Sequence, residues 1–398
     1  MPRVHSDRFR LHPAEQADPE IELSVVMPCL NEFKTVGTLI ERARHTLLDH
    51  GIPGEIIVAD NGSTDGSQEI AEEQGAHVIR VETRGYSNAL RGGIAKARGK
   101  YVLIGDSDGS YDFSHIPRFL ERLREGYDLV VGNRFQGGIA PGAMPPLHRY
   151  LGIPIMSAMA RVLYQSPCGD HHCGLRAFRK SSFERLDLHA DGWEFNSEMI
   201  ARASILRMNI CEVPTTLSRD GRGRPSHLCT FSAGWQHLRT LLFYNPLFTF
   251  IYPGIFLMIL GLAALILLIP GPRIVAGIRF NVITMAYAGA AMVVGFQGIL
   301  LGILARIYGT SRGIFPENGI FSRITRSSPL EPGLLLAAVL IGFGIIGIIV
   351  PLVSWTAQGF AISSPLPVLR AMIPSMVCLV IGGQVVLFSF FLSILRIR

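Results

Sequence analysis

Asp106 and Asp108 are the residues of this sequence best suited to chemistry, because they flank a single residue at the end of a predicted strand. Side chains at positions i and i+2 of a strand point to the same face. Two carboxylates so placed form an oxygen-rich site suited to Mg²⁺ or Mn²⁺, which takes its remaining ligands from water and substrate phosphates. A D-x-D sequence in Gly/Ser-rich surroundings also occurs by chance in solvated loops, so the pair alone leaves both interpretations open.

The elements that must position these carboxylates alternate between strand and helix signals. The predicted strands cover residues 21–27, 55–59, 77–81, 101–105 and a segment from 128 to 131, and the helices between them cover 33–50, 64–74 and 85–98. This alternation predicts an α/β fold with a mostly parallel, Rossmann-like sheet covered on both faces. Ligands bind such sheets at the carboxyl ends of the strands. Polar residues follow three of those ends, at 28–32, 60–63 and 106–108.

Several common site motifs do not occur where this pattern would need them. No G-x-G-x-x-G follows the first strand, and neither G-x-x-x-x-G-K-[ST] nor G-x-S-x-G is present. A dinucleotide fold, a P-loop and a serine-hydrolase elbow are therefore unsupported. The segment from Cys168 to Cys173 crowds His and Cys together, but structural zinc sites usually combine two separated pairs and no second pair is evident. Asp60 remains available to accept hydrogen bonds from a base or ribose.

The charges divide the chain into two halves. The 398 residues carry 37 basic and 31 acidic side chains, a net charge of +6. From Asn245 onward there are nine Arg and two Glu, so the basic excess lies in the C-terminal half and does not indicate nucleic-acid binding. Only 17% of the residues are charged, against about 25% in an average soluble domain. The first 20 residues contain no apolar run, and we expect no signal peptide and a reduced, cytosol-facing domain.

Four apolar stretches in the C-terminal half are long enough to cross a bilayer, which takes about 20 helical residues. They are approximately 247–269, 282–304, 333–355 and 371–395. The loop between the second and third spans and the C-terminal end carry most of the arginines, which favours both termini and the N-terminal domain in the cytoplasm. We expect a multi-pass protein of the plasma or inner membrane. The small residues in the last two spans leave two roles open, anchoring alone or packing between protomers of a homo-oligomer.

Two shorter segments have the composition of helices that lie at a membrane surface. In residues 231–245 the side chains of Trp235, Leu238, Leu241 and Leu242 recur at helical spacing with polar residues between them. Residues 147–164 are also apolar and Arg-bearing but too short to span. Both patterns predict helices at the bilayer interface, with packing against the soluble domain as the alternative. The predicted order is a polar tail (1–20), an α/β domain (21–230), an interfacial helix (231–245) and a membrane domain (246–398).

Seven segments occur in a fixed order across residues 22–230. They are VVMPCLNE (25–32), VADNGSTDGS (58–67), RGYSNALRGGIAKARG (84–99), IGDSDGSYD (104–112), VGNRFQGG (131–138), CGLRAF (173–178) and EVP (212–214). In this order they resemble the catalytic domain of glycosyltransferase family 2, in the branch of polyprenyl-phosphate sugar synthases related to dolichyl-phosphate mannose synthase. The resemblance implies a GT-A fold, a nucleotide-diphosphate sugar donor, a polyprenyl-phosphate acceptor and Mg²⁺ or Mn²⁺ as cofactor.

The same resemblance implies roles for individual residues. Those implied for the nucleotide sugar are Pro28, Leu30, Glu32, Asp60, Asn61, Arg84, Asp106, Ser107, Glu194 and Arg222. Those implied for metal binding are Asp106 and Asp108, and those for catalysis are Asp106, Asp108 and Arg134. Those implied for the lipid phosphate are Arg134, Arg149, Ser157 and Arg176. The segment 219–227 (RDGRGRPSH) matches a basic loop that closes over the donor, and the sequence leaves open which of Arg219, Arg222 and Arg224 is equivalent.

Two departures from the family pattern put the sugar and base preference in doubt. Many relatives have two Asp at 60–61, whereas Asn61 stands here, and many have Gln where Ser110 stands. The chemistry is less affected. A lipid phosphate has a second pKa of about 6, so it is largely ionised at pH 7 and attacks without a strong general base. In-line attack by that phosphate inverts the anomeric centre.

Two other functions remain open from the sequence. A processive polysaccharide synthase would carry Q-x-x-R-W, whereas Gln236 and Arg239 are followed here by Thr240, and four spans are few for threading a polymer. A catalytically inactive membrane scaffold has no need of the Asp106/Asp108 pair. The sequence also leaves open whether Glu194 and Glu198, one helical turn apart, contact the donor sugar or face solvent.

Overall fold

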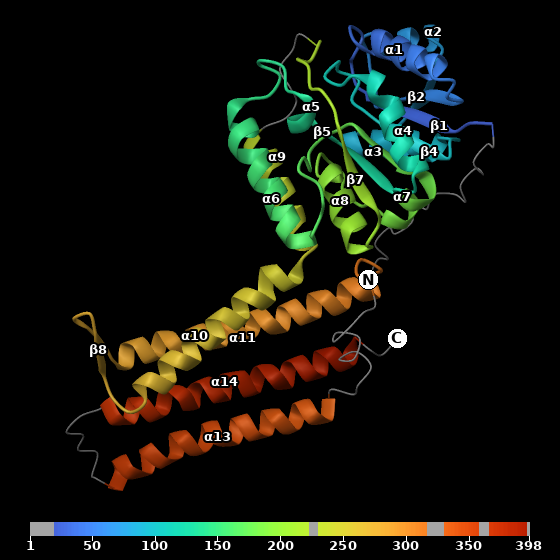
Figure 1. Cartoon of the computed structure of the whole chain (residues 1–398). Helices are drawn as coiled ribbons and strands as arrows, with labels where there is room; N and C mark the ends of the chain where they lie inside the picture. The colour runs from blue at the N-terminus through green and yellow to red at the C-terminus, as the bar shows by residue number, and fades with distance from the viewer. Residues whose placement is uncertain (1–19, 223–229, 317–329, 358–365, 396–398) are drawn as a thin grey trace. The chain divides into compact units, whose positions relative to one another are not determined.

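The computed structural model describes residues 20–222, 230–316, 330–357 and 366–395, and it divides the chain into two units, Met1–Tyr244 and Asn245–Arg398 (Figure 1). The boundary agrees with the change in composition at Asn245. The predicted tail lies outside the described residues except for Glu20.

The N-terminal unit is built on a seven-stranded sheet with the order β3-β2-β1-β4-β6-β5-β7. The strands are β1 (Leu23–Cys29), β2 (Gly54–Asp60), β3 (His77–Arg80), β4 (Tyr101–Ile104), β5 (Leu129–Asn133), β6 (Arg176–Arg179) and β7 (Ile210–Pro214). All neighbouring strands are parallel except β6, which is antiparallel to both β4 and β5. The predicted mostly parallel GT-A-like sheet is therefore confirmed. The sequence patterns did not predict β6, because it has only four residues and its first is an arginine.

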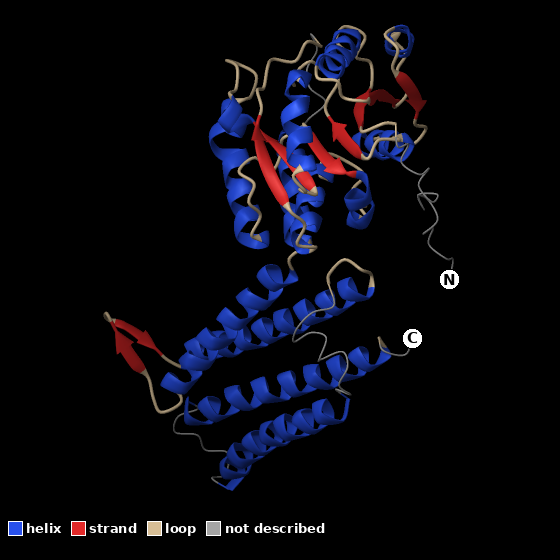
Figure 2. Cartoon of the chain, turned by 45° about the vertical axis from the view of Figure 1, so that its right-hand side comes forward, coloured by secondary structure: helices blue, strands red, loops and turns tan. Residues whose placement is uncertain are grey.

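The register of the sheet brings three strand ends to one edge. Cys29 at the end of β1 pairs with Asp60 at the end of β2, and Val26 pairs with Ile104 at the end of β4. The central strand β1 is buried from Leu23 to Met27, which requires cover on both faces of the sheet. Figure 2 shows helices on both sides of the strands. The polar residues that follow these strands therefore leave the sheet close together, as the alternating pattern predicted.

The three helices predicted at 33–50, 64–74 and 85–98 are found as α1 (Val36–Asp49), α2 (Ser67–Glu73) and α3 (Tyr86–Lys96), with ends shifted by up to three residues. The helices that were not predicted are η1 (Phe113–His115), α4 (Ile116–Arg124), α5 (Arg134–Gly137), α7 (Lys180–Leu186) and α8 (Phe195–Ile205). The remaining ones are η2 (His148–Gly152), α6 (Ile153–Tyr164) and α9 (Thr230–Phe243). Helix α3 packs tightly on the sheet, since a side-chain atom at Gly93 would meet Val26 Cγ1 at 2.6 Å. The predicted interface segments correspond to η2–α6 and to α9.

The C-terminal unit contains four helical stretches, within its described residues, that are long and apolar enough to cross a membrane, at 247–268, 282–311, 330–356 and 366–394. They are formed by η3 (Leu247–Ile251) with α10 (Tyr252–Leu268), α11 (Val282–Ser311), α13 (Leu330–Ala357) and α14 (Leu366–Ile394). A short hairpin, β8 (Arg273–Val275) and β9 (Ile278–Phe280), joins α10 to α11. The four predicted spans are thus found as helices, three of them longer than predicted.

Glycines set the closest helix contacts in this unit. A Cβ at Gly254 of α10 would lie 2.6 Å from the carbonyl oxygen of Gly295 on α11, and a Cβ at Gly295 would lie 2.5 Å from that of Gly254. Small residues at such crossings let two helix backbones approach in a membrane. On α13 and α14, Gly344, Gly347 and Gly382 serve the contact between these two helices in the same way.

Candidate active site

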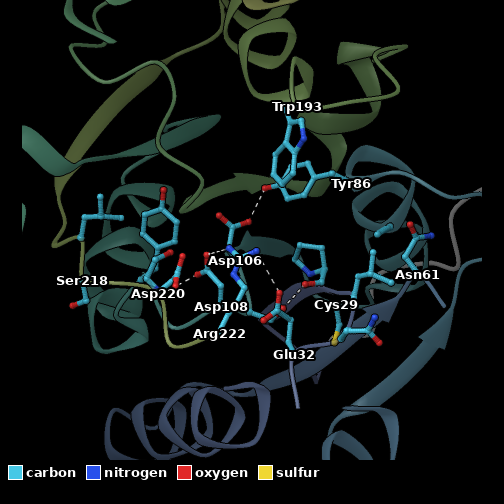
Figure 3. A pocket seen from close by; sticks show the side chains of 18 of the residues that line it. Cys29, Glu32, Asn61, Tyr86, Asp106, Asp108, Trp193, Ser218, Asp220 and Arg222 are labelled. Atoms are coloured by element: carbon cyan, nitrogen blue, oxygen red, sulfur yellow. Dashed lines mark hydrogen bonds and ion pairs between the residues drawn. The ribbon is translucent and has the colours of Figure 1, made fainter. Parts of the chain in front are cut away.

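A cavity of about 790 Å³ opens at the strand ends of the N-terminal unit (Figure 3). Eleven residues were predicted for the nucleotide sugar or the carboxylate pair. Nine of them contribute to the wall of this cavity: Pro28, Leu30, Glu32, Asn61, Arg84, Asp106, Ser107, Asp108 and Arg222. Arg134 also lines it. The structure therefore brings together residues that are up to 194 positions apart in the sequence (28 to 222).

Asp106 and Asp108 lie in the loop after β4, not on the strand as predicted, because β4 ends at Ile104. Both still face the same cavity. The loop is held to the end of β1, because the Ser107 hydroxyl donates to the Pro28 carbonyl at 2.5 Å and the Thr35 hydroxyl donates to the Ser107 carbonyl at 2.7 Å. The convergence of the two carboxylates thus comes from loop hydrogen bonds and not from strand alternation.

The two carboxylates have different partners. Asp106 Oδ1 accepts a hydrogen bond from the Tyr86 hydroxyl at 2.9 Å, and Asp108 Oδ1 accepts from the Ser110 backbone N–H at 2.9 Å. Burial, together with the negative charge of Asp108, raises the pKa of Asp106 to about 6. A buried carboxylate with a second carboxylate next to it favours a cation beside it.

Arg222, which lies 114 positions after Asp108 in the sequence, supplies such a cation. Its guanidinium forms an ion pair with Asp108, and its Nη1 lies 3.5 Å from Glu32 Oε1. Of the two arginines of this loop that the structure describes, Arg222 reaches the carboxylates, whereas Arg219 donates to the Pro141 carbonyl at 2.6 Å. Arg224 lies outside the described residues.

The carboxylate pair fits a hard divalent cation that is completed by a substrate. Arg222 shows that the site already accommodates positive charge at Asp108. Across the residues that the structure describes there is no group of three or more His, Cys, Asp and Glu side chains that would hold a metal on its own. Mg²⁺ typically takes one or two protein carboxylates and fills its octahedral shell with waters and substrate phosphates. Asp106 and Asp108 match that ligand set.

Asp60 and Asn61 shape the cavity through their hydrogen bonds. Asp60 is buried and is not part of the wall; its carboxylate accepts from the N–H groups of Gly62 and Ser63 and from Gln68 Nε2. Asn61 Nδ2 donates to the carbonyls of 81 and 83, and Asn61 Oδ1 accepts from the N–H of residue 85 at 2.7 Å. An Asp at 61 could not make the two donations, so this departure from the family pattern has a local structural reason.

Arg134 lies at the inner end of the cavity and is held by a buried carboxylate. Its Nε and Nη2 donate to the two oxygens of Asp170 at 2.7 and 2.8 Å, and its backbone N–H donates to the same carboxylate at 3.1 Å. Arg134 is 7% exposed and Asp170 is fully buried. A bidentate pair of this kind fixes the plane of the guanidinium. Arg134 is therefore a preorganised cation facing the cavity.

A second cavity of about 560 Å³ continues from the first and has a different character. Both cavities are lined by Tyr86, Asp106, Tyr111, Arg134, His148, Ile153 and Trp193. The remaining wall of the second cavity is mainly apolar. One side of it is formed by Leu147, which precedes η2, by Leu151 on η2 and by Met156 on α6. The other side is formed by Trp235 and Leu238 on α9. We call this second cavity the apolar groove. The predicted interface segments thus form its two walls.

The structure does not bring all predicted residues to these cavities. Arg149 lies beside the ring of Tyr150, the Ser157 hydroxyl accepts from the His171 N–H at 3.3 Å, and Arg176 is fully buried; none of the three lines either cavity. Glu194 lines neither cavity as well. The solvent-facing alternative for Glu198 is wrong, because this residue is buried. Its carboxylate accepts from the backbone N–H groups of 189 and 190 and from the Tyr244 hydroxyl, and it lines neither cavity.

Aromatic residues of the site were missed by sequence reasoning. Tyr86 and Trp193 stack with ring centroids 4.4 Å apart, and both line the two cavities (Figure 3). Tyr111 also lines both cavities, and its hydroxyl accepts a hydrogen bond from the Gly174 N–H at 2.8 Å. Tyr86 belongs to the segment 84–99 and Tyr111 to 104–112, so their position next to site residues was the available signal.

Comparison with known proteins identifies the family of the chain. Residues 24–187 match the model of "Glycosyl transferase family 2", and residues 303–396 match the "Glycosyltransferase family 2 C-terminal transmembrane region". The chain is 35% identical over 393 residues to the low-salt glycan biosynthesis hexosyltransferase Agl6 of Haloferax volcanii, which covers 98% of this chain and 93% of the relative. It is 31% identical over 198 residues to a dolichyl-phosphate hexose transferase of the same organism, with 48% of this chain and 81% of the relative covered.

Among solved structures, glucosyl-3-phosphoglycerate synthase from Mycobacterium tuberculosis in complex with Mn²⁺, UDP and phosphoglyceric acid matches with a TM-score of 0.46 and 24% identity, over 56% of this chain and 78% of that one. The fold, the membrane helices and the sequence relatives define a membrane-bound hexosyltransferase. The chain belongs to glycosyltransferase family 2.

Proposed function

We propose that this protein transfers one hexose from a nucleotide-diphosphate sugar to a polyprenyl phosphate, with inversion at the anomeric carbon. The observation that carries the proposal is the meeting of two unlike cavities at Asp106 and Arg134. The first cavity carries the charged side chains of Glu32, Asp108 and Arg222 and fits a nucleotide diphosphate; we call it the polar cavity. The second is the apolar groove, which fits a hydrocarbon chain. A relative named as a dolichyl-phosphate hexose transferase supports the same acceptor class.

The donor occupies the polar cavity in this proposal. Its diphosphate lies at Asp106, Asp108 and Arg222, and its nucleoside lies toward the residues after β1 and β2. Asp106 and Asp108 would hold Mg²⁺ or Mn²⁺, which when bound supplies positive charge to the departing diphosphate. Arg222 exchanges its carboxylate partners for phosphate oxygens, since guanidinium groups bind both in the same bidentate way.

The acceptor phosphate lies at Arg134, with its isoprenoid chain in the apolar groove. Its second pKa of about 6 leaves it largely ionised at pH 7, so its oxygen attacks without transferring a proton to the protein. Arg134 neutralises and orients this nucleophile, and Asp170 fixes the guanidinium by both of its oxygens. Positioning two reactants in this way is itself a large part of catalysis.

The groove walls also suit a membrane surface. Tyr150, Ile155 and Val162 on η2–α6 are 72%, 48% and 70% exposed, and Trp235 on α9 is 60% exposed. Apolar side chains exposed next to arginines are typical of helices that lie in the headgroup region. In this proposal the four spans lie in the inner or plasma membrane, with the arginine-rich loop and the C-terminal end on the cytoplasmic side. The catalytic unit and both termini then lie in the cytoplasm.

A donor panel tests the proposal. Purified full-length protein is mixed with Mg²⁺ or Mn²⁺, undecaprenyl or dolichyl phosphate and each common UDP- or GDP-hexose, and the lipid products are analysed by mass spectrometry. We expect a single hexose on the lipid, and loss of this product in Arg134→Ala but not in Arg122→Ala, whose guanidinium pairs with Glu125 on the surface. A product that grows beyond one sugar, or that forms without lipid phosphate, would instead identify a polysaccharide synthase.

A further inference from the structure

Three polar side chains interrupt the otherwise apolar part of the groove. They are His172 in the loop before β6, Asn196 on α8 and His237 on α9, and all three belong to the groove wall but not to the polar cavity. A polyprenyl chain offers no hydrogen bonds, so a groove that holds only such a chain has no use for these groups. Buried polar groups without a partner cost free energy, and their presence needs a reason.

The two histidines touch each other, and Asn196 precedes the serine that contacts His237. The His172 and His237 rings meet edge to face with centroids 4.4 Å apart, and His237 Nδ1 lies 2.8 Å from the Ser197 hydroxyl. His172 Nδ1 and Asn196 Oδ1 are buried and have no hydrogen-bond partner among the described residues. Polar atoms that are removed from water in this way are normally paired. Both atoms belong to side chains of the groove wall, so this wall has hydrogen-bonding capacity that the described residues leave unused.

Arg176 holds this cluster in place from behind. Its guanidinium donates to the carbonyls of His171, Cys173 and Asn196 at 2.5, 2.7 and 2.6 Å. The carbonyls of His171 and Cys173 flank His172 in the chain, and the third carbonyl is that of Asn196. The fully buried Arg176 therefore fixes the positions of two of the three side chains. A cluster fixed by such contacts is preorganised for a ligand and does not collapse onto itself.

The charge state of the cluster decides which ligand it fits. Burial, with the positive charge of Arg176 nearby, lowers the pKa of His237 to about 4, and burial also holds the pKa of His172 well below its usual value. Both rings are thus neutral at pH 7, and they add no charge for a phosphate beyond that of Arg134. A neutral imidazole and an amide each offer both a donor and an acceptor. Hydroxyl groups, which also donate and accept, are their natural partners.

We propose that His172, Asn196 and His237 form a subsite for the hydroxyl groups of a sugar. The subsite adjoins Asp106, Arg134 and Trp193, which line both cavities. The sugar is either the hexose of the donor or a sugar already carried by the acceptor lipid. The inference rests on the proposed function only in assigning the two cavities to donor and acceptor.

Binding measurements with and without the sugar test this subsite. The probes are UDP against UDP-glucose, GDP against GDP-mannose, and undecaprenyl phosphate against undecaprenyl-phosphate glucose, titrated calorimetrically into the full-length protein. The variants His172→Phe and Asn196→Leu keep the volume of the side chain and remove its hydrogen bonds. His45→Phe on the exposed face of α1 is the matched control.

We expect each variant to weaken binding of one sugar-bearing probe by about 3- to 10-fold per lost hydrogen bond, with binding of its sugar-free counterpart unchanged. An effect confined to the nucleotide sugars assigns the subsite to the donor hexose, and one confined to the glycosylated lipid assigns it to the acceptor. We also expect His172→Phe to keep or raise the melting temperature, because it removes a buried nitrogen without a partner.

Equal effects on probes with and without the sugar, or no effect on any pair, would overturn the proposal. Asn196→Leu gives an independent answer if His172→Phe proves unstable. The outcome is separable from that of the proposed function. If the donor panel yields no glycosylated lipid phosphate but the variants still weaken binding of a nucleotide sugar selectively, the acceptor assignment fails and the sugar subsite stands.

Discussion

Replacing Asp170 by Asn tests the central claim that Arg134 is preorganised by a buried charge. The change keeps the size of the side chain but removes its negative charge and one of its two acceptor oxygens. The loop that carries it stays anchored, because the backbone N–H groups of Gly169 and Asp170 donate independently to Glu212 at 2.7 and 2.9 Å. The variant therefore perturbs the ion pair and little else.

The size of the effect follows from burial. The side chains of Arg134 and Asp170 are 8% and 0% exposed, so solvent screens their interaction weakly. Breaking a buried pair by removing one partner costs about 3–5 kcal/mol, because the other charge is left buried and uncompensated. For a unit of this size 1 kcal/mol corresponds to about 2–4 °C in melting temperature. We expect Asp170→Asn to lower the melting temperature of the N-terminal unit by roughly 6–20 °C.

The chain offers a matched control on its surface. Arg124 donates to both oxygens of Glu22 at 2.8 and 2.6 Å, the same bidentate geometry, but its side chain is 54% exposed. Exposed pairs are worth about 0–1 kcal/mol, so Glu22→Gln should shift the melting temperature by at most about 4 °C. Thermal unfolding of the purified protein in detergent, followed by tryptophan fluorescence, compares the two variants.

Activity gives a second measurement on the same variant. A guanidinium released from Asp170 no longer keeps one orientation, and misplacement of a positioning group by about 1 Å costs on the order of 100-fold in rate. We expect kcat/KM for lipid phosphate to fall by that order in Asp170→Asn while binding of the free nucleotide is unchanged. Equal losses of stability in Asp170→Asn and Glu22→Gln, or a fully active Asp170→Asn, would refute the reasoning.

Three further predictions concern other parts of the molecule. Asp108→Asn should lower turnover with Mg²⁺ or Mn²⁺ by at least about 100-fold, and unchanged turnover across a metal titration would remove the metal assignment. Burial opposes ionisation of Glu55, but hydrogen bonds from Ser24 and Arg98 outweigh it and hold the pKa of Glu55 below its usual value of about 4.3. Its contribution to stability is therefore present above that pH and lost as the pH falls through the lowered pKa, so the acid-unfolding profile of Glu55→Gln should be flatter there than that of the wild type. Gly254→Val should destabilise the α10–α11 contact by about 1–3 kcal/mol, measured as a lower melting temperature in detergent, whereas Gly383→Ala, with no atom within 4 Å of the added carbon, should not.

The fold could be predicted from the sequence where a local pattern determines it. Residues 21–27 are mostly apolar, and β1 forms there because a strand covered on both faces is predominantly apolar. The buried exception, Ser24, donates a hydrogen bond to Glu55. The four spans were predicted for a similar reason, since length and apolar composition decide whether a helix can cross a bilayer. Strand β6 was missed because its pairing with β4 and β5 decides its conformation, and its four residues carry too little pattern of their own.

The site was predictable where a family motif fixed it and not where a distant partner decides the role. Asp106 and Asp108 were predicted from their spacing, although loop hydrogen bonds and not strand geometry bring them together. Arg176 matches a family motif, yet its three carbonyl partners place it behind the groove wall. Ser157 likewise lies against the backbone of His171. A motif predicts that such a residue matters but not whether it contacts the ligand or supports a residue that does.

Arg222 shows why the choice between Arg219 and Arg222 needed the structure. Arg219 and Arg222 lie three positions apart in one loop, yet one binds the carbonyl of Pro141 and the other reaches Asp108, which is 114 positions earlier in the chain. Their types and local sequence are equivalent, and only the path of the loop over the cavity separates them. That path also has a chemical consequence. In the proposed function, an arginine already paired with the carboxylates leaves them when a diphosphate and its cation bind, so donor binding would change the partners of Arg222.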